Sequence, residues 1–231
     1  MRIIVIGASG PTGRQLTAQA LGTGHHVTAI SRHPRGLPRH DHLTVVAADA
    51  TDPAAIDPVV AGADAVLSTL GVTPSRKPVT TYSAATTAVI TAMRRHGVRR
   101  LMVVSSSVLD PGWRPSNAFF FNHVLDPYVN RVLIRQVHQD MRRMEELVRA
   151  SDLDWTIVRP SGLFEHPTVT DHLVADGSAD GVFTARADLA AAMLRELAEQ
   201  RFLRRAMGVV TTAVKPGLVR LVRDEVLRSP R

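Results

Sequence analysis

The chain has 231 residues, a length that suits one domain, and its hydrophobic share of 45% excludes a disordered protein. It contains no cysteine, which excludes disulfides, thiolate catalysis and cysteine metal sites, and we predict no metal site. The net charge of +7 fits an arginine-rich solvated surface, attraction to phosphate-bearing ligands, or nucleic-acid binding. We expect no nucleic-acid partner, because only 4% of the residues are aromatic and none interleave with a basic patch.

Short apolar runs alternate with helical patterns along the chain. This alternation predicts βαβ units, hence an α/β fold with a doubly wound parallel sheet, and we expect residues 1–231 to form a single domain. The expected strands are Ile3–Ile6, His26–Ile30, Leu43–Ala47, Ala65–Thr69, Leu101–Val104 and Trp155–Val158, and the expected helices are Gly13–Leu21, Pro53–Val60, Tyr82–His96 and Tyr128–Ala150.

The opening apolar run, Ile3–Ile6, breaks at Gly7, which is too short for the core of a signal peptide. No apolar stretch approaches the length that spans a bilayer. We therefore expect a cytoplasmic protein without a membrane partner.

Two segments interrupt the alternation. Asp110–Pro127 contains three prolines, Trp113 and the run Phe119–Phe121, which is typical of a long loop at the carboxyl edge of the sheet. It is either a packed surface insertion or a lid over a substrate, and we favour the lid. The basic segment from about residue 214 to 231 resembles an amphipathic helix that docks on the body or on a second subunit, so an oligomer through this tail is conceivable.

The first expected strand leads directly into a glycine-rich loop that opens a helix. Its residues, Gly7-Ala8-Ser9-Gly10-Pro11-Thr12-Gly13, have the spacing G-x-x-G-x-x-G. Glycine permits the tight turn and the close approach of a diphosphate, and the helix N-terminus presents unpaired N–H groups to it. The strand before and the helix after this loop predict a dinucleotide site.

The end of the second expected strand indicates which dinucleotide binds. An acidic residue there would hold the ribose 2′-hydroxyl of NAD, but this strand is followed by Ser31-Arg32-His33, with Arg35 close behind. A hydroxyl and a guanidinium suit the 2′-phosphate of NADP(H), which we predict as the cofactor. The alternative is that Arg32 is a solvated surface residue.

These motifs resemble the atypical short-chain dehydrogenase/reductases with an NmrA-like NAD(P)H-binding domain, nearest the flavin reductase/biliverdin reductase B group. The resemblance runs from residue 1 to about 211, with a small C-terminal substrate region, and implies a Rossmann fold. The matching blocks are Ile4–Gly13, Ala48–Asp52, Leu67–Gly71, Val103–Ser107 and Met144–Pro160.

The resemblance also implies roles by position. Asp49 and Ala50 would border the adenine, and Leu70 and Gly71 would pass under the adenosine and diphosphate. Other interpretations remain open: Asp49 as a helix cap, and the serines of 105–107 as partners for backbone groups. The resemblance places Ser105, Ser106 and Pro160 near the expected nicotinamide. The alternative interpretation of Arg159, which precedes Pro160, is a structural ion-pair residue.

Reductases with a full catalytic set use Tyr-x-x-x-Lys, in which tyrosine supplies the proton. Here Tyr82 is followed four residues later by Thr86, and Tyr128 by Val132, so neither fits. The biliverdin reductase B group also lacks that tyrosine, and its important serine aligns with Ser106. The nearby titratable candidates for catalysis are His123, His138 and Asp140, each of which is otherwise an ordinary surface residue.

Three functions are compatible with this sequence. The first is an NADP(H)-dependent reductase of a planar conjugated small molecule such as a flavin or quinone. The second is a redox sensor of the NmrA kind, which binds NADP(H) without turnover and acts through a protein partner. The third is a tailoring enzyme of secondary metabolism, including a redox-neutral isomerase or dehydratase, since fold alone does not choose among them.

Overall fold

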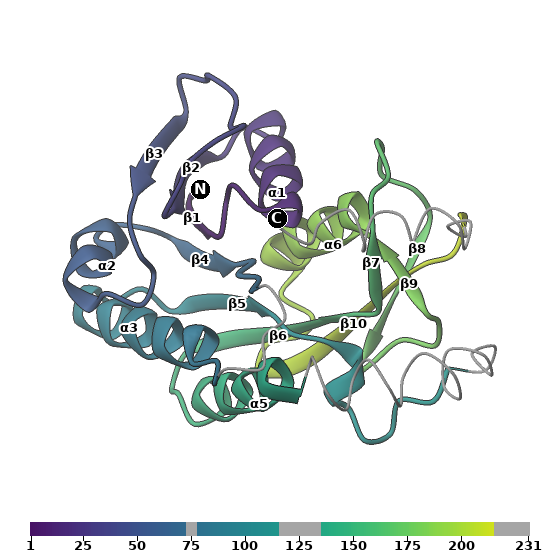
Figure 1. The fold of residues 1–231 in the computed structure, drawn as a ribbon. Helices are drawn as coiled ribbons and strands as arrows, with labels where there is room; N and C mark the ends of the chain where they lie inside the picture. Colours follow the sequence, from purple (N-terminus) through teal and green to yellow (C-terminus); the bar gives the residue numbers. More distant parts are fainter. Residues whose placement is uncertain (73–77, 116–134, 215–231) are drawn as a thin grey trace.

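The computed structural model describes residues 1–72, 78–115 and 135–214, and Figure 1 shows their arrangement. Helices lie on both faces of one long twisted sheet. The elements are, in chain order, β1 Arg2–Ile6, α1 Pro11–Gly22, β2 His26–Ser31, β3 Leu43–Ala47, α2 Pro53–Val60, β4 Ala65–Ser68, α3 Thr81–His96, β5 Arg100–Val104, the 3₁₀ turn η1 Ser107–Leu109, α5 Arg135–Arg149, β6 Asp154–Pro160, β7 Gly162–Phe164, β8 His172–Asp176, β9 Phe183–Ala185, α6 Arg186–Glu199 and β10 Arg205–Thr211.

The main sheet has eight strands in the order β3-β2-β1-β4-β5-β6-β10-β8. All neighbours are parallel except β8, which runs antiparallel to β10 at one edge. The first six strands confirm the predicted doubly wound fold. The chain order reverses beside β1, and ligands of such sheets bind at this reversal, outside the carboxyl ends of the strands.

Successive residues of the central strands point to opposite faces, and both faces are covered. Ile4 and Ile6 pack toward α2, α3 and α5, whereas Ile3 and Val5 pack toward α1 and α6. This double burial explains why these strands are continuously apolar rather than alternating. The edge strand β3 is the exception, since Val45 on it is 45% exposed.

The last third of the chain contains elements that the sequence reading did not place. Strands β10 and β8 extend the sheet, and α6 packs on one face of it. Strands β7 and β9 pair as a separate two-stranded sheet. Two of these strands have three residues each, too few for a periodic pattern to be recognised. Residues 116–127 of the expected lid and residues 215–231 of the expected tail lie outside the described part of the chain.

A buried ion pair fastens α6 to the start of β5. Arg100 Nη2 lies 3.1 Å from Glu196 Oε1, and both side chains are almost completely buried. Arg100 Nη1 also donates to Thr156 Oγ1 at 2.9 Å, and Glu196 accepts the backbone N–H of Phe202 at 2.9 Å. Each charge is therefore compensated by an opposite charge and by hydrogen bonds.

We expect Glu196→Gln to destabilise the protein by about 3–5 kcal/mol, because it leaves the Arg100 guanidinium buried without its counter-charge. The free energy of unfolding from urea titration measures this. The matched control is Asp152→Asn, which breaks an exposed ion pair with Arg94 and should shift the urea midpoint little. Equal shifts for the two variants would contradict the assigned importance of the buried pair.

Candidate functional site

The glycine-rich loop joins β1 to α1 at the carboxyl edge of the sheet. Two of its glycines are required by the protein itself. Gly7 has φ +78°, a conformation that other residues rarely adopt, and a Cβ on Gly13 would lie 2.2 Å from the carbonyl oxygen of Gly7. These glycines bring the loop backbone tightly against the start of α1.

Gly10 is less constrained by the protein, because the single atom that a Cβ would meet needs to move by only a few tenths of an ångström. Its φ of −68° and ψ of 162° suit any residue, and a Cβ would meet only the Gly7 carbonyl oxygen, at 3.1 Å. Pro11 follows it as the first residue of α1, where its missing N–H is no loss. A Cβ at Gly10 would occupy the space where a diphosphate approaches the helix N-terminus, so the loop fits the predicted cofactor.

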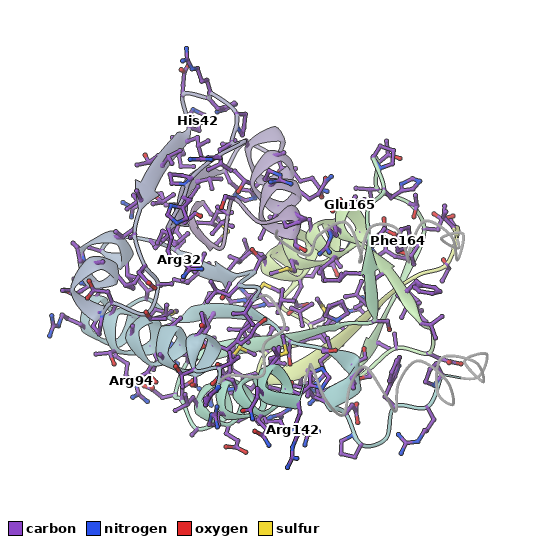
Figure 2. The ribbon with its side chains drawn as sticks, viewed as in Figure 1. Arg32, His42, Arg94, Arg142, Phe164 and Glu165 are labelled. Atoms are coloured by element: carbon purple, nitrogen blue, oxygen red, sulfur yellow. The ribbon has the colours of Figure 1, made fainter. Side chains whose placement is uncertain are left out.

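Two serines connect the loop with the end of β2. The hydroxyl groups of Ser9 and Ser31 are hydrogen-bonded to each other. Arg32 comes next along the chain and is exposed, and Figure 2 shows it at the end of β2. The positive charge of Arg32 also reaches Asp49, whose pKa is lowered first by hydrogen bonds from Thr51 and then by this charge. The predicted 2′-phosphate residues therefore stand beside the loop.

The segment after β4 lies against the loop as expected. A Cβ on Gly7 would come within 2.9 Å of the Thr69 carbonyl oxygen and 3.1 Å of the Leu70 amide nitrogen. The backbone of Leu70 therefore lies against the loop, and Gly71 is the next residue along the chain. Ala50 is buried in the core, whereas Asp49 before it is exposed. Asp49 does not cap α2, because Asp52 accepts the Ala54 N–H at 3.0 Å.

The three serines after β5 have different partners. Ser105 donates to Glu145 Oε1 at 2.7 Å, and Ser107 donates to the Arg159 carbonyl oxygen at 3.0 Å. Ser106 accepts a long hydrogen bond of 3.4 Å from the Val108 N–H, which caps η1. Because a hydroxyl both donates and accepts, the Ser106 hydrogen can be given to a ligand.

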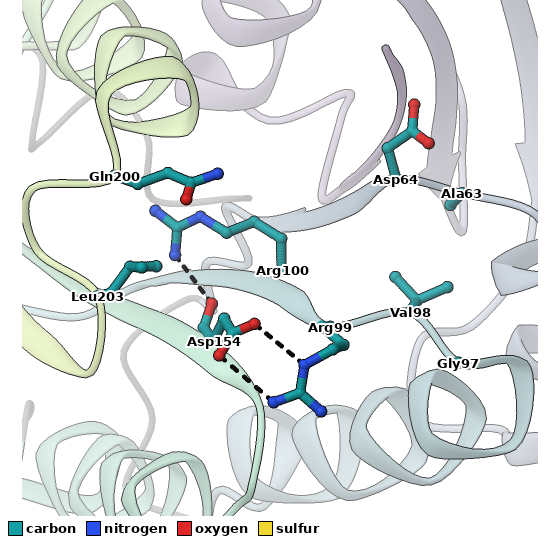
Figure 3. A pocket seen from close by; sticks show the side chains of 9 residues that line it. All are labelled: Ala63, Asp64, Gly97, Val98, Arg99, Arg100, Asp154, Gln200 and Leu203. Carbon is teal, nitrogen blue, oxygen red and sulfur yellow. Dashed lines mark hydrogen bonds and ion pairs between the residues drawn. The ribbon is translucent and has the colours of Figure 1, made fainter.

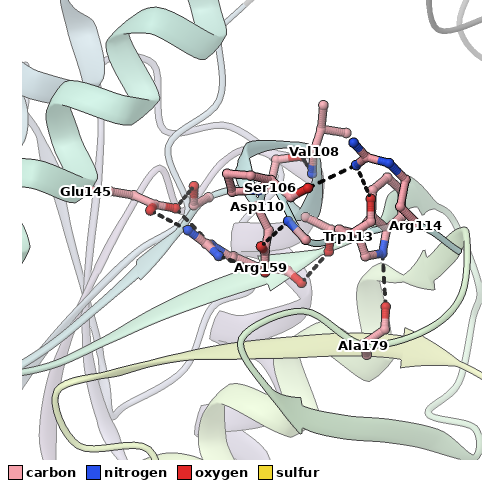
Figure 4. A network of polar contacts seen from close by, with 12 residues as sticks. Ser106, Val108, Asp110, Trp113, Arg114, Glu145, Arg159 and Ala179 are labelled. Carbon is pink, nitrogen blue, oxygen red and sulfur yellow. Dashed lines mark hydrogen bonds and ion pairs between the residues drawn. The ribbon is translucent and has the colours of Figure 1, made fainter.

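A buried ion-pair network holds this strand end in place (Figure 4). Arg159, at the end of β6, binds Glu145 of α5 with two hydrogen bonds, of 2.7 and 3.1 Å. Burial alone raises the pKa of Glu145, but hydrogen bonds from Arg159 and Ser105 outweigh it and lower that pKa. Pro160 follows Arg159 and is buried beside the network. Arg159 is thus the ion-pair residue of the alternative interpretation.

The described start of the expected lid is attached to the body at two points. Asp110 Oδ2 lies 3.1 Å from Arg159 Nη1, which extends the ion-pair network into the loop. Trp113 Nε1 donates to the Ala179 carbonyl oxygen, between β8 and β9, at 3.0 Å (Figure 4). The anchors thus attach this segment to the end of β6 and to the loop between β8 and β9.

The catalytic candidate Asp140, on α5, is turned toward α3. Asp140 is fully buried and accepts the N–H of Tyr82 at 2.8 Å and the hydroxyl of Ser83, and Arg143 lies 3.3 Å away. Its carboxylate thus binds the first turn of α3, where the exposed N–H groups need an acceptor, and it has no open face for proton transfer. His138 is half-buried on α5. His123 lies outside the described residues.

Arg186 was missed by the sequence reading. It is the first residue of α6, and its Nη1 donates to Thr12 Oγ1 at 2.9 Å, within the glycine-rich loop. Its Nε lies 3.1 Å from Glu165 Oε1, just after β7. No motif marks it, because 174 residues separate Arg186 from Thr12.

A polar cavity of 340 Å³ lies at the opposite, amino edge of the sheet (Figure 3). Its charged lining includes Arg99, bound to Asp154 at 3.1 Å, and Arg100 of the buried ion pair. The chemistry expected of this fold belongs to the carboxyl edge, so we do not place the site in this cavity. Within the described ranges, no helix is long and apolar enough to cross a membrane.

Substitutions at the two loop glycines should separate folding from binding. We expect Gly10→Val to fold with little loss of stability and to lose dinucleotide binding, because its side chain fills the diphosphate space. Gly13→Ala should instead fail to fold or unfold at a much lower temperature, because backbone atoms surround its Cβ. Thermal unfolding and calorimetric titration measure both effects. Unchanged affinity in a folded Gly10→Val protein would remove this loop from the site.

Comparison with known proteins agrees with this geometry. A profile of the family described as NAD(P)H-binding matches residues 7–200. A Mycobacterium tuberculosis protein, Rv2047c, is 37% identical over 107 residues, which are 46% of this chain but 12% of that protein. YwnB of Bacillus subtilis is 23% identical and is covered completely, with 92% of this chain.

The fold is also that of a Veillonella parvula short-chain dehydrogenase/reductase solved in complex with NADP. The two chains are 23% identical, with a TM-score of 0.74 and coverage of 94% of this chain and 99% of that one. The chain therefore belongs to the family of NAD(P)H-binding proteins and has the Rossmann fold.

Proposed function

We propose that this protein is an NADP(H)-dependent reductase that delivers hydride to a planar conjugated small molecule, such as a flavin or a quinone. The single observation that carries the proposal is that the glycine-rich loop, Arg32 and Ser106 follow the carboxyl ends of β1, β2 and β5, which share one edge of the sheet. Family membership supports the cofactor class, and the substrate class is our inference. The cytoplasmic location and an oligomer through the tail belong to this proposal as well.

The choice of NADP(H) over NAD(H) is supported by charge. Ser31 is held beside the loop by Ser9, and Arg32 follows it with its side chain in solvent. A guanidinium binds a phosphate through two parallel N–H groups. The 2′-hydroxyl of NAD(H) has no charge and cannot accept both of these hydrogen bonds in that way. Asp49 stands close to Arg32 and already accepts hydrogen bonds from Thr51, of 2.9 and 2.8 Å.

We expect Arg32→Ala to weaken NADPH binding by about 1.5–3 kcal/mol, the contribution of a hydrogen bond to a charged group, and to change NADH binding little. Calorimetric titration with both cofactors measures this. Arg35→Ala tests the alternative, in which this neighbouring arginine makes the contact with the 2′-phosphate. Equal losses for NADPH and NADH in Arg32→Ala would make Arg32 a structural residue and place the 2′-phosphate contact elsewhere.

The proposed reaction does not need a tyrosine acid. Tyr82 is buried, its hydroxyl accepts the Val72 N–H at 3.3 Å, and burial raises its pKa to about 12. It is therefore a poor proton donor at neutral pH. A conjugated acceptor spreads the charge of an incoming hydride and takes its proton from solvent, so the protein mainly positions two planar rings. Ser106 can donate a hydrogen bond to that acceptor.

We expect Ser106→Ala to lower kcat with FMN or a quinone by on the order of a hundredfold, as for loss of one donor to a developing negative charge. The dissociation constant for NADPH should stay near that of the wild type. Ser106→Thr, which retains a hydroxyl, should recover most of the activity. Steady-state NADPH oxidation and calorimetry give the two quantities.

Two results would count against this assignment. If Ser106→Ala turns over as fast as the wild type, the hydroxyl only caps η1. If the wild type binds NADPH tightly and oxidises it with no flavin, quinone or enone, the redox sensor takes the lead over the reductase. The absence of a Tyr-x-x-x-Lys motif from the sequence is the observation that favours this second function.

A further inference from the structure

The side chain of Arg186 connects three separate parts of the carboxyl edge. It starts from the first residue of α6, reaches Thr12 in the first turn of α1, and forms an ion pair with Glu165 after β7. Its side chain is 12% exposed, whereas that of Glu165 is 43% exposed. A mostly buried guanidinium is thus held against the glycine-rich loop, with a more exposed carboxylate as its counter-ion. Figure 2 shows Glu165 next to Phe164, at the end of β7.

The contact with Thr12 places this positive charge where a diphosphate would bind. Thr12 is the second residue of α1, and the N–H groups of a first helical turn have no acceptor within the helix. Those N–H groups and the helix dipole attract an anion but supply no full positive charge. Arg14, another cation near the loop, donates to the Ser9 carbonyl oxygen at 2.8 Å and is exposed.

We propose that Arg186 binds the diphosphate of the dinucleotide and that this anion competes with Glu165 for its guanidinium. The inference rests on the proposed NADP(H) site and adds to it a binding residue, Arg186, that is distant in the sequence from the glycine-rich loop. Because Glu165 follows β7, the exchange couples the filling of the glycine-rich loop to the small β7–β9 sheet. A guanidinium with five N–H donors can keep its bond to Thr12 while it binds a phosphate oxygen.

Another residue provides a matched control for a purely structural role. Gln19, on the same helix α1, donates from Nε2 to the carbonyl oxygen of Ala187, next to Arg186, at 3.0 Å. It therefore joins α1 to α6 in the same way as Arg186 but away from the loop. If Arg186 only braces these two helices, Gln19→Ala and Arg186→Gln should have similar effects.

The test measures calorimetric binding of two fragments of the cofactor. ADP-ribose carries the diphosphate without a 2′-phosphate, and adenosine 2′-monophosphate carries the 2′-phosphate without the diphosphate. We expect Arg186→Gln to weaken ADP-ribose binding about ten- to a hundredfold and to leave adenosine 2′-monophosphate unchanged. Arg186→Lys should retain part of the affinity, and Gln19→Ala all of it. Thermal unfolding of each variant establishes that it is folded.

Glu165→Gln provides a second measurement, because it leaves Arg186 and the glycine-rich loop unchanged. Removal of the competing carboxylate should tighten ADP-ribose binding by about threefold. The effect is small because solvent and salt screen the partly exposed Arg186–Glu165 pair. Weaker ADP-ribose binding in Glu165→Gln would overturn the proposed competition. Arg186→Gln with wild-type affinity for ADP-ribose, or losses equal to those of Gln19→Ala, would overturn the assignment of Arg186. A wild type that binds neither fragment would instead overturn the proposed dinucleotide site.

Discussion

The buried pair of Arg159 and Glu145 fixes the carboxyl edge on which the candidate site is built. It joins the end of β6 to α5 and, through Ser105, to the end of β5. A buried pair is costly to break, about 3–5 kcal/mol when one partner is removed. Asp110 adds the start of the expected lid to the same arginine. The strand ends, the helix and the loop therefore keep one relative position.

This network also determines which serine would be left to act in the proposed reaction. Ser105 and Ser107 give their hydrogens to Glu145 and to the Arg159 carbonyl, and both are buried. Ser106, between them, points the other way along the extended chain and only caps η1. The fold thus uses two hydroxyls to hold the strand end and presents the third at the edge where ligands of this fold bind.

The candidate site was largely predictable where it depends on contiguous sequence. The glycine-rich loop, Arg32 and the segment after β4 follow strands that are apolar enough to recognise, and parallel strands bring their carboxyl ends to one edge. Asp140 could not be judged in this way. Its type and position suit a proton donor, but α5 packs against α3 and places its carboxylate on the N–H groups of Tyr82 and Ser83.

Local sequence patterns were enough to predict the doubly wound sheet up to β6, the glycine-rich loop and the polar end of β2, because each depends on residues close together along the chain. The arrangement of the last third depends on contacts between distant residues and became visible only in the fold. The contacts of Arg186 with Thr12 and of Trp113 with Ala179 join segments 174 and 66 residues apart. Side-chain partners at such separations depend on how the two helix layers pack on the sheet, and no local sequence pattern predicts them.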